Sequence, residues 1–490
     1  MIKTDLLIAR YEERKTLEAV FESTRAEFIA VHGRRRVGKT YLIKQFFKLK
    51  EEAVFFHVTG TRDAHMPEQI NDFVEVMESV FYDNMLNITP PKNWKKTFSL
   101  LTNIIQKANH KKVILFFDEL PWLAGRRSRF VQALDYYWNR HWCDIPCIKL
   151  IVCGSAASWM QENVISHKGG LHNRITGQIA LSPFELRDTK EYLLSKKIHY
   201  NEEQILEIYM VTGGIPYYLD FLKKNLSTPQ NIDQLCFQNK GPLVDEFSRL
   251  YASLFNHAEE YEELIRIIAA KRNGIERKSI IKKLKNTTDG GRLKEKFDAL
   301  ERSGFIVSFK PYGFEKRGTF YRVIDEYSLF YLFWIEKSLS SIRKLDKTKG
   351  HWLQEYQSPQ WHAWAGYAFE AVCYKHIAQL RKALDIQASA IVGSWKYIPQ
   401  KGNQEPGAQI DLLFDRNDGV ITLCEIKYTD KPYRLTKDET RILNKKIEVF
   451  RNRTQCQKQI HIVLITNLPI QKTMYSEEMI THNIVLSDLF

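Results

Sequence analysis

The sequence predicts an α/β protein whose largest part is a parallel sheet with helices on both faces, followed by helical and mixed units. Three observations predict this class. Apolar stretches alternate with helical ones over residues 1–186, a glycine-containing loop joins the first apolar stretch to a helix, and a similar alternation resumes after residue 360. Strands that alternate with helices usually form parallel sheets covered on both faces.

Five stretches of the N-terminal region are expected to be strands. Each is short and rich in aliphatic and aromatic residues, as strands buried on both faces of a sheet are. A helix is expected to start at Lys39, directly after the loop. The expected strands are residues 26–32, 53–58, 112–117, 148–153 and 175–181.

The length and the charge of the chain limit what it can be. With 490 residues, the chain is expected to form three or four domains. Lys and Arg number 72 against 58 Asp and Glu, so the net charge is +14. Positive charge of this size favours polyanions such as nucleic acid, although it can also serve solubility alone.

The cysteines and the apolar runs exclude several protein classes. The seven cysteines are scattered and odd in number, which is not the pattern of a disulfide scaffold. Cys143 and Cys147 have no second Cys or His pair at zinc spacing. The most apolar run, residues 327–335, is too short to span a bilayer, and the first residues lack the shape of a signal peptide. We expect a cytoplasmic protein with no membrane partner.

The loop at residues 33–40 carries the clearest chemical signal. It fits the pattern G-x-x-x-x-G-K-[ST], follows an apolar strand and opens a helix, which is the context that a phosphate-binding P-loop requires. Backbone N–H groups and the helix N-terminus would hold the phosphates of ATP. Lys39 would reach the β- and γ-phosphates, and the Thr40 hydroxyl would bind Mg²⁺.

Two acidic residues end the strand expected at residues 112–117. Asp118 is predicted to hold Mg²⁺ beside the loop, and Glu119 to orient or activate the attacking water. The alternatives are a strand-end cap for Asp118 and a solvated turn residue for Glu119. Ser155, after the fourth strand, is a candidate sensor of the γ-phosphate or a simple turn residue. Arg174 is a candidate phosphate contact or a surface arginine.

These motifs resemble those of the archaeal-type ATPases, a group within the AAA+ and STAND-related P-loop proteins. The similarity covers about the first 330 residues and includes a winged helix-turn-helix expected within residues 253–340. It implies that Pro216 abuts the adenine and that Arg10 packs near the nucleotide, although Ala9 stands where the group usually has Gly or Asn. The matching segments are residues 8–13, 33–40, 117–119, 154–155 and 213–216.

The nucleotide site is therefore expected to combine the loop with four later residues. The resemblance also makes a nucleotide-dependent homo-oligomer possible. The residues expected to bind the nucleotide are Gly33, Arg34, Arg36, Val37, Gly38, Lys39, Thr40, Tyr41, Ser155, Arg174 and Pro216.

A helical segment and a smaller unit follow the ATPase core. Residues 212–216 form a sharp break between helices within the helical part. Three short helices (residues 262–271, 278–284 and 291–302) and a hairpin (305–309 and 319–324) describe a winged helix-turn-helix. Its cations Arg292, Lys294 and Lys296 and the hairpin tip at residues 310–317 could meet DNA, or the unit could serve only packing between domains.

The C-terminal unit carries a second set of chemical residues. Strands are expected at 408–414, 421–428 and 460–466, with a last one near residue 484, and helices at 363–378 and 439–450. Alternation along paired strands brings Asp411 and Gln409 to one face, and Glu425 and Lys427 to one face of the next strand. Glu370 lies on the helix before them. Gly350 and Pro359 suggest a linker ahead of this unit.

This set resembles the PD-(D/E)xK nucleases, whose hairpin follows an acidic helix residue and carries Asp and then (D/E)-x-K. The resemblance implies that Asp411 and Glu425 hold Mg²⁺ and that Lys427 positions water for attack on a phosphodiester. The proline that precedes the Asp in the motif is absent here. A charged hairpin facing solvent is the alternative, but acids on such an apolar strand need a reason.

The sequence thus predicts a P-loop parallel sheet with a helical lid, a winged helix-turn-helix and a C-terminal mixed α/β nuclease-like domain. The expected function is ATP hydrolysis coupled to Mg²⁺-dependent cleavage of nucleic acid, with DNA favoured. The alternative is an ATP-driven regulatory switch whose last domain only binds nucleic acid or a partner. The expected catalytic residues are Lys39, Glu119, Glu370, Asp411, Glu425 and Lys427, and the expected domains are residues 1–186, 187–252, 253–340 and 341–490.

Overall fold

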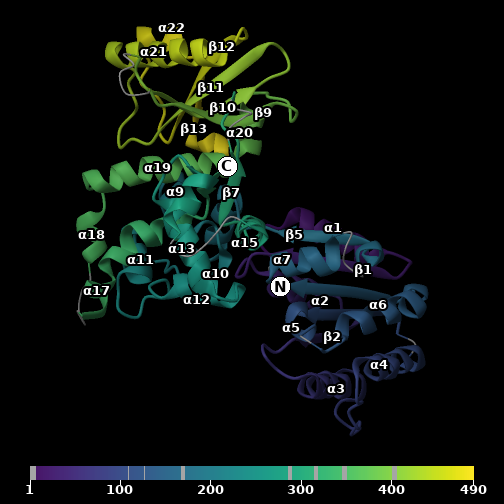
Figure 1. Cartoon of the computed structure of the whole chain (residues 1–490). Coiled ribbons are helices and arrows are strands. Elements are labelled where there is room, and N and C mark those ends of the chain that lie inside the picture. The colour runs from purple at the N-terminus through teal and green to yellow at the C-terminus, as the bar shows by residue number, and fades with distance from the viewer. Residues whose placement is uncertain are drawn as a thin grey trace. The chain divides into compact units, whose positions relative to one another are not determined.

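The computed structural model describes most of the chain and divides it into two compact units. The first unit holds the residues up to Pro183 together with Ile215–Tyr217 and Leu254–Asn256, and the second holds the remainder. Each unit contains a cluster of buried hydrophobic side chains, and Figure 1 labels the helices and strands of both. The described residues are 7–108, 110–125, 127–166, 171–284, 290–313, 318–344, 350–399 and 405–490.

The first unit is built on a five-stranded parallel sheet, as the sequence predicted. Its strand order is β2-β3-β4-β1-β5, and every neighbouring pair is parallel. In such a sheet the carboxyl ends of the strands share one edge, where ligands are usually bound. The strands are β1 (Glu27–Gly33), β2 (Ala53–Thr59), β3 (Lys112–Asp118), β4 (Ile148–Gly154) and β5 (Gly177–Leu181).

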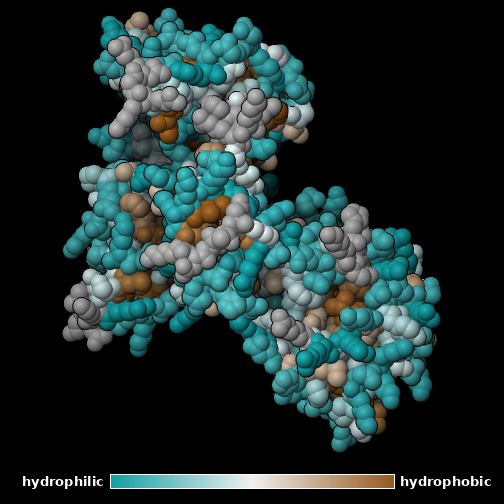
Figure 2. All heavy atoms as spheres, viewed as in Figure 1, coloured by the Kyte–Doolittle hydropathy of each residue, from teal (hydrophilic) through white to brown (hydrophobic). Residues whose placement is uncertain are grey.

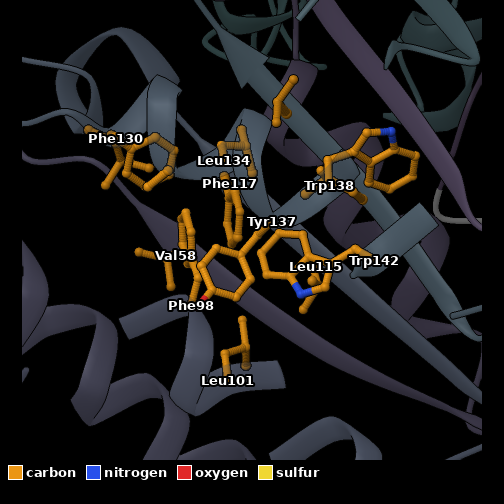
Figure 3. Packing of buried hydrophobic residues seen from close by; sticks show 14 of the residues in the cluster. Val58, Phe98, Leu101, Leu115, Phe117, Phe130, Leu134, Tyr137, Trp138 and Trp142 are labelled. Atoms are coloured by element: carbon orange, nitrogen blue, oxygen red, sulfur yellow. The ribbon is translucent and has the colours of Figure 1, made fainter. Parts of the chain in front are cut away.

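Helices cover both faces of this sheet because alternate strand residues point to opposite sides. On β2, Phe56 packs against Phe73 with ring centroids 5.0 Å apart, whereas Phe55 lies 5.9 Å from Phe47 on the other face. Figure 3 shows the larger core, in which Phe98 and other aromatic side chains interlock. The main helices are α1 (Tyr11–Glu22), α2 (Lys39–Lys48), α3 (Met66–Tyr82), α4 (Trp94–Ala108) and α6 (Phe130–Arg140), and the shorter ones α5 (Leu120–Leu123) and α7 (Ala157–Met160).

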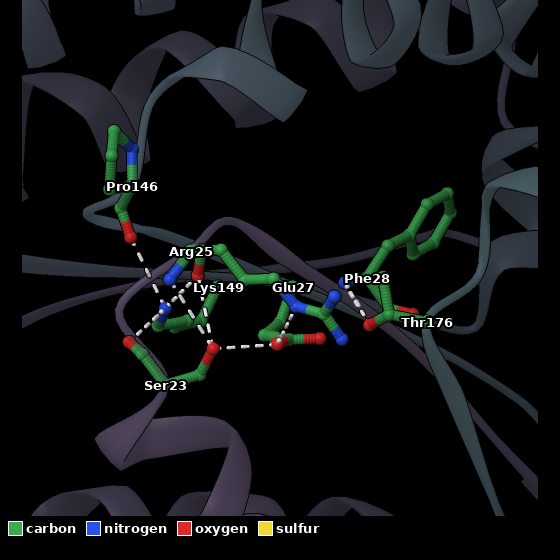
Figure 4. Close-up of polar contacts among 7 residues, drawn as sticks. All are labelled: Ser23, Arg25, Glu27, Phe28, Pro146, Lys149 and Thr176. Carbon is green, nitrogen blue, oxygen red and sulfur yellow. Dashed lines mark hydrogen bonds and ion pairs between the residues drawn. The ribbon is translucent and has the colours of Figure 1, made fainter.

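A buried lysine fastens the amino end of the sheet. Lys149, in β4, is 1% exposed, and its ammonium donates to the carbonyl oxygens of Ser23 at 2.9 Å, Pro146 at 3.2 Å and Arg25 (Figure 4). Burial lowers the pKa of Lys149. A buried charge needs several partners, and here backbone oxygens supply them. This cluster lies at the edge opposite the phosphate loop and is structural.

The second unit begins with helices and a small antiparallel sheet. The sheet has the order β6-β8-β7, and its strand β6 was missed by the sequence analysis because it has only two residues. Residues 314–317 of the expected hairpin tip lie outside the described part of the chain. The elements are α8 (Leu186–Ser195), α9 (Glu202–Thr212), α10 (Pro216–Leu219), α11 (Thr228–Cys236), α12 (Glu246–Leu254), α13 (Ala258–Ala269), β6 (Ile275–Glu276), α14 (Arg277–Lys283), α15 (Gly291–Arg302), β7 (Ile306–Phe309) and β8 (Phe320–Val323).

Aromatic packing fills the segment where a linker was expected. Trp352 is fully buried, with ring centroids 5.1 Å from Phe237, 5.0 Å from Trp334 and 5.3 Å from Trp361. A chain so tightly packed does not behave as a free linker. The helices here are α16 (Glu326–Phe330), a π-helical turn at Tyr331–Ile335, α17 (Glu336–Lys344), α18 (His351–Glu355) and α19 (Pro359–Lys375).

The C-terminal region forms a separate mixed sheet with the order β13-β12-β11-β10-β9. The β9-β10-β11 part is antiparallel and the β11-β12-β13 part is parallel. Strand β9 was not predicted. The elements are α20 (Ile377–Ala383), β9 (Ile391–Tyr397), β10 (Ala408–Asp415), β11 (Val420–Lys427), α21 (Lys437–Thr454), β12 (Gln459–Thr466), α22 (Met474–Met479) and β13 (His482–Val485).

The surface is mostly polar, as expected for a protein whose apolar side chains are buried in its cores. The face shown in Figure 2 is mostly hydrophilic, with smaller hydrophobic patches between the hydrophilic residues. Among the described helices, none combines the length and the apolar character that crossing a bilayer requires.

Candidate functional sites

The phosphate loop runs from the end of β1 to the start of α2. Gly33 has φ 144°, and a Cβ atom there would lie 2.2 Å from the Leu181 carbonyl oxygen, so only glycine fits. Gly38 has φ 91° and directly precedes α2. Two glycines thus let the loop fold back so that helix α2 begins at the carboxyl edge of the sheet.

Lys39 lies buried at the start of α2 and is held by the loop itself. Its ammonium donates to the carbonyl oxygens of Gly33 and Arg34, each at 2.9 Å. Burial lowers the pKa of Lys39, while the nearby Glu119 and Asp118 act in the opposite direction. The cation is therefore positioned by neutral partners and keeps its charge available to an anion.

Thr40 and Asp118 meet across the first turn of α2 and the end of β3. The Thr40 hydroxyl donates to Asp118 Oδ2 at 2.7 Å, and the Glu119 backbone N–H donates to Oδ1 at 3.0 Å. Burial opposes ionisation of Asp118, but the neighbouring His57 and the hydrogen bonds from the Thr40 hydroxyl and the Glu119 N–H outweigh it and lower the pKa. His57, at the end of β2, has its Nε2 3.9 Å from Oδ2 of Asp118. The sequence analysis missed this residue because no motif marks it.

Glu119 and Ser155 are in direct contact. The Ser155 hydroxyl donates to Oε1 of Glu119, and the Ser155 backbone N–H donates to Oε2 at 3.3 Å. Glu119 itself has φ 47°, an uncommon backbone region for a residue with a side chain. Two residues that the sequence suggested separately therefore form one group at the carboxyl edge of the sheet.

Two further contacts join distant segments to the phosphate loop. Arg10 is buried and donates to the Val37 carbonyl oxygen at 3.1 Å. The Arg36 guanidinium lies 4.2 Å above the ring of Tyr217, next to Pro216. Ala9 has φ 56°, which explains why a residue tolerant of positive φ, such as Gly or Asn, suits this position.

The remaining predicted nucleotide residues differ in their surroundings. Arg34 and Val37 are buried, whereas the Tyr41 side chain is exposed. Arg174 lies with its Nε 3.7 Å from Oδ1 of Asp135 on α6, so it pairs with a carboxylate of the protein. That contact favours the surface-arginine alternative for Arg174.

In the second unit, Asp411 of β10 lies beside β11 and the helix α19. Its Oδ1 accepts a hydrogen bond from Gln409 at 3.0 Å, and its Oδ2 lies 3.5 Å from the donating Ile426 N–H. Burial and the nearby Glu425 raise the pKa of Asp411. We call Glu370, Asp411, Glu425 and Lys427 the acidic site.

Glu370 belongs to this group through its electrostatics. Burial raises its pKa to about 8, with Asp411 and Glu425 adding to the effect and Arg322 opposing it. The helix α19, which carries Glu370, packs against β11, which carries Glu425. Nearby negative charges raise the pKa of a buried carboxyl. Arg322 of β8, 8% exposed and 4.4 Å above the ring of Tyr374, was not anticipated from the sequence.

Glu425 is neutralised by two lysines. Lys427 Nζ lies 2.8 Å from Oε1, and Lys446 Nζ on α21 lies 2.9 Å from both Oε1 and Oε2. Burial opposes ionisation of Glu425, but the two ammonium groups outweigh it and lower the pKa. Lys446 was missed, although it lies three residues after the buried Leu443 on the inward face of its helix.

The acidic site also reaches the small antiparallel unit. Asn273, just before β6, donates to Gln409 Oε1 at 2.6 Å, and Gln409 in turn donates to Asp411. Of the cations expected on α15, Lys296 is 13% exposed and paired with Glu260, which turns it away from solvent. Arg292 and Lys294 are exposed.

As the side chains lie, the described residues include no group of three or more His, Cys, Asp or Glu placed to hold a metal ion. At the acidic site the reason is visible, since Glu425 faces two ammonium groups. Asp411 and Glu425 remain oxygen donors of the kind that Mg²⁺ prefers.

Comparison with known proteins finds a family match for the N-terminal region. Residues 7–222 match the model of an ATPase domain predominantly from Archaea. An uncharacterized protein of Methanocaldococcus jannaschii is 25% identical over 452 residues, covering 90% of this chain and 92% of that protein. An uncharacterized ATP-binding protein of the same organism is 42% identical over 53 residues, which are 10% of this chain and 90% of that protein.

Solved structures with partial likeness cover about two thirds of the chain. A Walker-type ATPase of Pyrococcus abyssi is 19% identical, with a TM-score of 0.47, and covers 66% of this chain and 96% of its own. The ORC2 protein of Aeropyrum pernix is 13% identical, with a TM-score of 0.43, and covers 70% of this chain and 98% of its own.

Proposed function

We propose, from the match of residues 7–222 to the model of an ATPase domain predominantly from Archaea, that Lys39, Thr40, Asp118 and Glu119 bind and hydrolyse ATP. The observation that carries this assignment is the 2.7 Å hydrogen bond from Thr40 to Asp118. It joins the residue after the P-loop lysine to the acid at the end of β3, the pair that holds Mg²⁺ in P-loop enzymes.

The residues of the phosphate-loop site have distinct roles in this proposal. The N-terminus of α2 and the ammonium of Lys39 bind the phosphates, which replace the Gly33 and Arg34 carbonyls as partners of that ammonium. The hydroxyl of Thr40 and the carboxylate of Asp118 fit Mg²⁺ as hard oxygen donors, and the ion would neutralise phosphate charge. Glu119, oriented by Ser155, takes the proton of the attacking water.

The test is ATP hydrolysis by Glu119→Gln. The amide keeps the shape and the contact with Ser155 but cannot accept the proton, so turnover should fall by roughly 10²–10⁴-fold while ATP still binds. Phosphate release and nucleotide affinity measured side by side decide this. Unchanged turnover would remove Glu119 from the proposed role.

For the second unit we propose Mg²⁺-dependent cleavage of DNA at the acidic site. The proposal rests on the convergence of Glu370, Asp411 and Glu425 with Lys427, and on the order of elements α19, β9, β10, β11, α21 and β12 around it. Asp411 and Glu425 would hold the ion, which would polarise a phosphodiester. Lys427 would orient the attacking water, and Glu370, with its pKa raised to about 8, would hold or release a proton near neutral pH.

The acidic site is tested by DNA cleavage with Mg²⁺ or Mn²⁺. Asp411→Asn should abolish cleavage, since the site loses a charge where metal and substrate meet. Asp415→Asn is the matched control, because Asp415 lies on the same strand but pairs with Lys458 and Tyr312. Cleavage that survives in Asp411→Asn would come from another site or a contaminant.

The regulatory switch remains the second candidate, favoured by the lysines that neutralise Glu425. In that case the second unit binds nucleic acid or a partner without cutting it. ATP hydrolysis without cleavage of single- or double-stranded DNA under any metal condition would select it.

A further inference from the structure

Lys446 occupies a special place at the acidic site. Its ammonium bridges the carboxylate of Glu425, with 2.9 Å to each oxygen. The Lys446 side chain is 24% exposed and that of Glu425 is 10% exposed. A cation centred between both oxygens of a carboxylate lies where a bidentate metal ion would lie.

We propose that Lys446 is a built-in cation that takes the metal position at Glu425 and must leave it before a divalent ion can bind. The inference rests on the proposed metal-dependent function of the acidic site. In this proposal Lys446 sets the metal affinity of the acidic site. Neither the PD-(D/E)xK pattern nor the P-loop motif includes this lysine.

The charge balance supports this exchange. Lys427 and Lys446 together bring two positive charges to one buried carboxylate. A divalent ion that binds at Glu425 is repelled by these two ammonium groups at short range. This repulsion weakens metal binding strongly because the carboxylate is largely buried. If the Lys446 ammonium withdraws, Asp411 and Glu425 face the ion with Lys427 alone.

The structure offers Lys446 a second position. Together with Lys396, Tyr397 and Gln409 it lines a cleft of about 360 Å³ beside the acidic site. Gln409 also donates to Asp411, so the cleft and the acidic site are continuous. An ammonium that turns from Glu425 into this cleft stands near Lys396, where two cations would attract a phosphate of the nucleic-acid strand.

The neighbouring lysine provides a control within the same helix. Lys445 is 55% exposed and pairs with Glu448 at 2.9 Å, on the outer side of α21. Removing its charge changes the net charge of the protein equally but leaves Glu425 and the cleft untouched.

The test measures Mn²⁺ binding by the full chain without nucleotide, by titration calorimetry or Mn²⁺ electron paramagnetic resonance. The variant Asp118→Asn serves as the background, so that the phosphate-loop site does not contribute. The double variant Asp118→Asn, Lys446→Met should bind Mn²⁺ at least about tenfold more tightly than Asp118→Asn alone, because one competing charge is gone. Lys445→Met should stay within about twofold, since exposed charges are screened.

Two further variants separate charge from folding. Lys446→Gln should behave as Lys446→Met, and Lys446→Arg should keep the weak affinity because it keeps the charge. Thermal unfolding checks that each variant folds, and any one folded, uncharged variant suffices. The Mn²⁺ concentration for half-maximal DNA cleavage should fall in Lys446→Met, whereas KM for DNA should rise because the cleft has lost a cation.

The outcomes distinguish the exchange from the function it rests on. If Asp411→Asn abolishes Mn²⁺ binding but folded Lys446→Met binds no more tightly than the background, the exchange is wrong and the metal site stands. If no variant binds Mn²⁺, or if Asp411→Asn leaves binding unchanged, both the exchange and the metal site are overturned.

Discussion

The two candidate sites each bring lysine and carboxylate together, yet they hold them in opposite ways. In the first unit, the Lys39 ammonium is held by backbone carbonyls and Asp118 by a hydroxyl and an N–H group. In the second unit, Glu425 accepts from two ammonium groups directly. Neutral partners leave charges available for a ligand, whereas paired charges cancel. In the proposed functions, the first site can therefore bind its ligand directly, whereas metal binding at the second site requires Glu425 to exchange partners first.

The largest effect expected from this comparison is the loss of ATP turnover when Lys39 is replaced. Because its cation is available to phosphate, Lys39→Ala should lower ATP turnover by at least about a hundredfold, as loss of a preorganised charge does elsewhere. The measurement is phosphate release at saturating ATP. Lys44→Ala, an exposed position of the same helix, should be unaffected. Equal turnover in both variants would show that Lys39 is not used.

The pH dependence of stability should set the second unit apart. Burial lowers the pKa of His376 to about 4, and its ring lies between the Leu186 N–H at 3.1 Å and the Val372 carbonyl at 2.8 Å. The unfolded chain takes up this proton near pH 6.5, so stability is complete above that pH and is lost as pH falls toward 4. The shift corresponds to about 3 kcal/mol.

Chemical denaturation between pH 4 and 7.5 measures that slope. His376→Gln removes the titrating group while keeping a side-chain acceptor. The loss of stability between pH 7.5 and pH 4 should therefore be smaller in this variant by about 3 kcal/mol. The exposed His482→Gln is the control. An identical slope in wild type and His376→Gln would contradict the assignment.

The backbone conformation of the phosphate loop can be tested by comparing the stability of variants at its two glycines. In Gly33→Ala the new Cβ would meet the Leu181 carbonyl, so the variant should lose about 2–3 kcal/mol of stability. Gly38→Ala has open space around the Cβ, and its positive φ should cost only about 1–2 kcal/mol. Urea unfolding of both variants compares them. If Gly38→Ala were the more damaging, the loop would not be held as described.

The smallest effect expected is that of Ser155→Ala. The variant removes one hydrogen bond that orients Glu119, so kcat should fall by about tenfold or less with little change in KM. Steady-state ATP hydrolysis measures both constants. A rise in kcat would instead mean that Ser155 holds Glu119 away from the reaction.

Much of the first unit could be predicted because its signals are local. Strands buried on both faces are apolar throughout, so β1, β3 and β4 were recognisable without any alternation. The loop motif fixes its own backbone shape through Gly33 and Gly38. Contacts between distant segments, such as those of Glu119 with Ser155, depend on the order of the strands and could only be suggested.

The second unit was harder to predict for physical reasons. Strand β9 lies at the edge of its sheet, with Ile391 exposed and Gly393 and Lys396 within it, so it has neither an apolar run nor clean alternation. The segment around Trp352 carried Gly and Pro signals typical of a linker, but tertiary packing of the indole outweighed them. Which of two adjacent lysines faces Glu425 depends on the rotation of α21.

We propose that ATP turnover at the phosphate-loop site governs DNA cleavage at the acidic site, as the sequence led us to expect. The most direct measurement is DNA cleavage with Mg²⁺ or Mn²⁺ by wild type, Lys39→Ala and Asp411→Ala, each with and without ATP. The account predicts that Asp411→Ala abolishes cleavage and that Lys39→Ala removes its dependence on ATP. Cleavage by no variant under any condition, with ATP hydrolysis intact in wild type and Asp411→Ala, would contradict it and leave the regulatory switch.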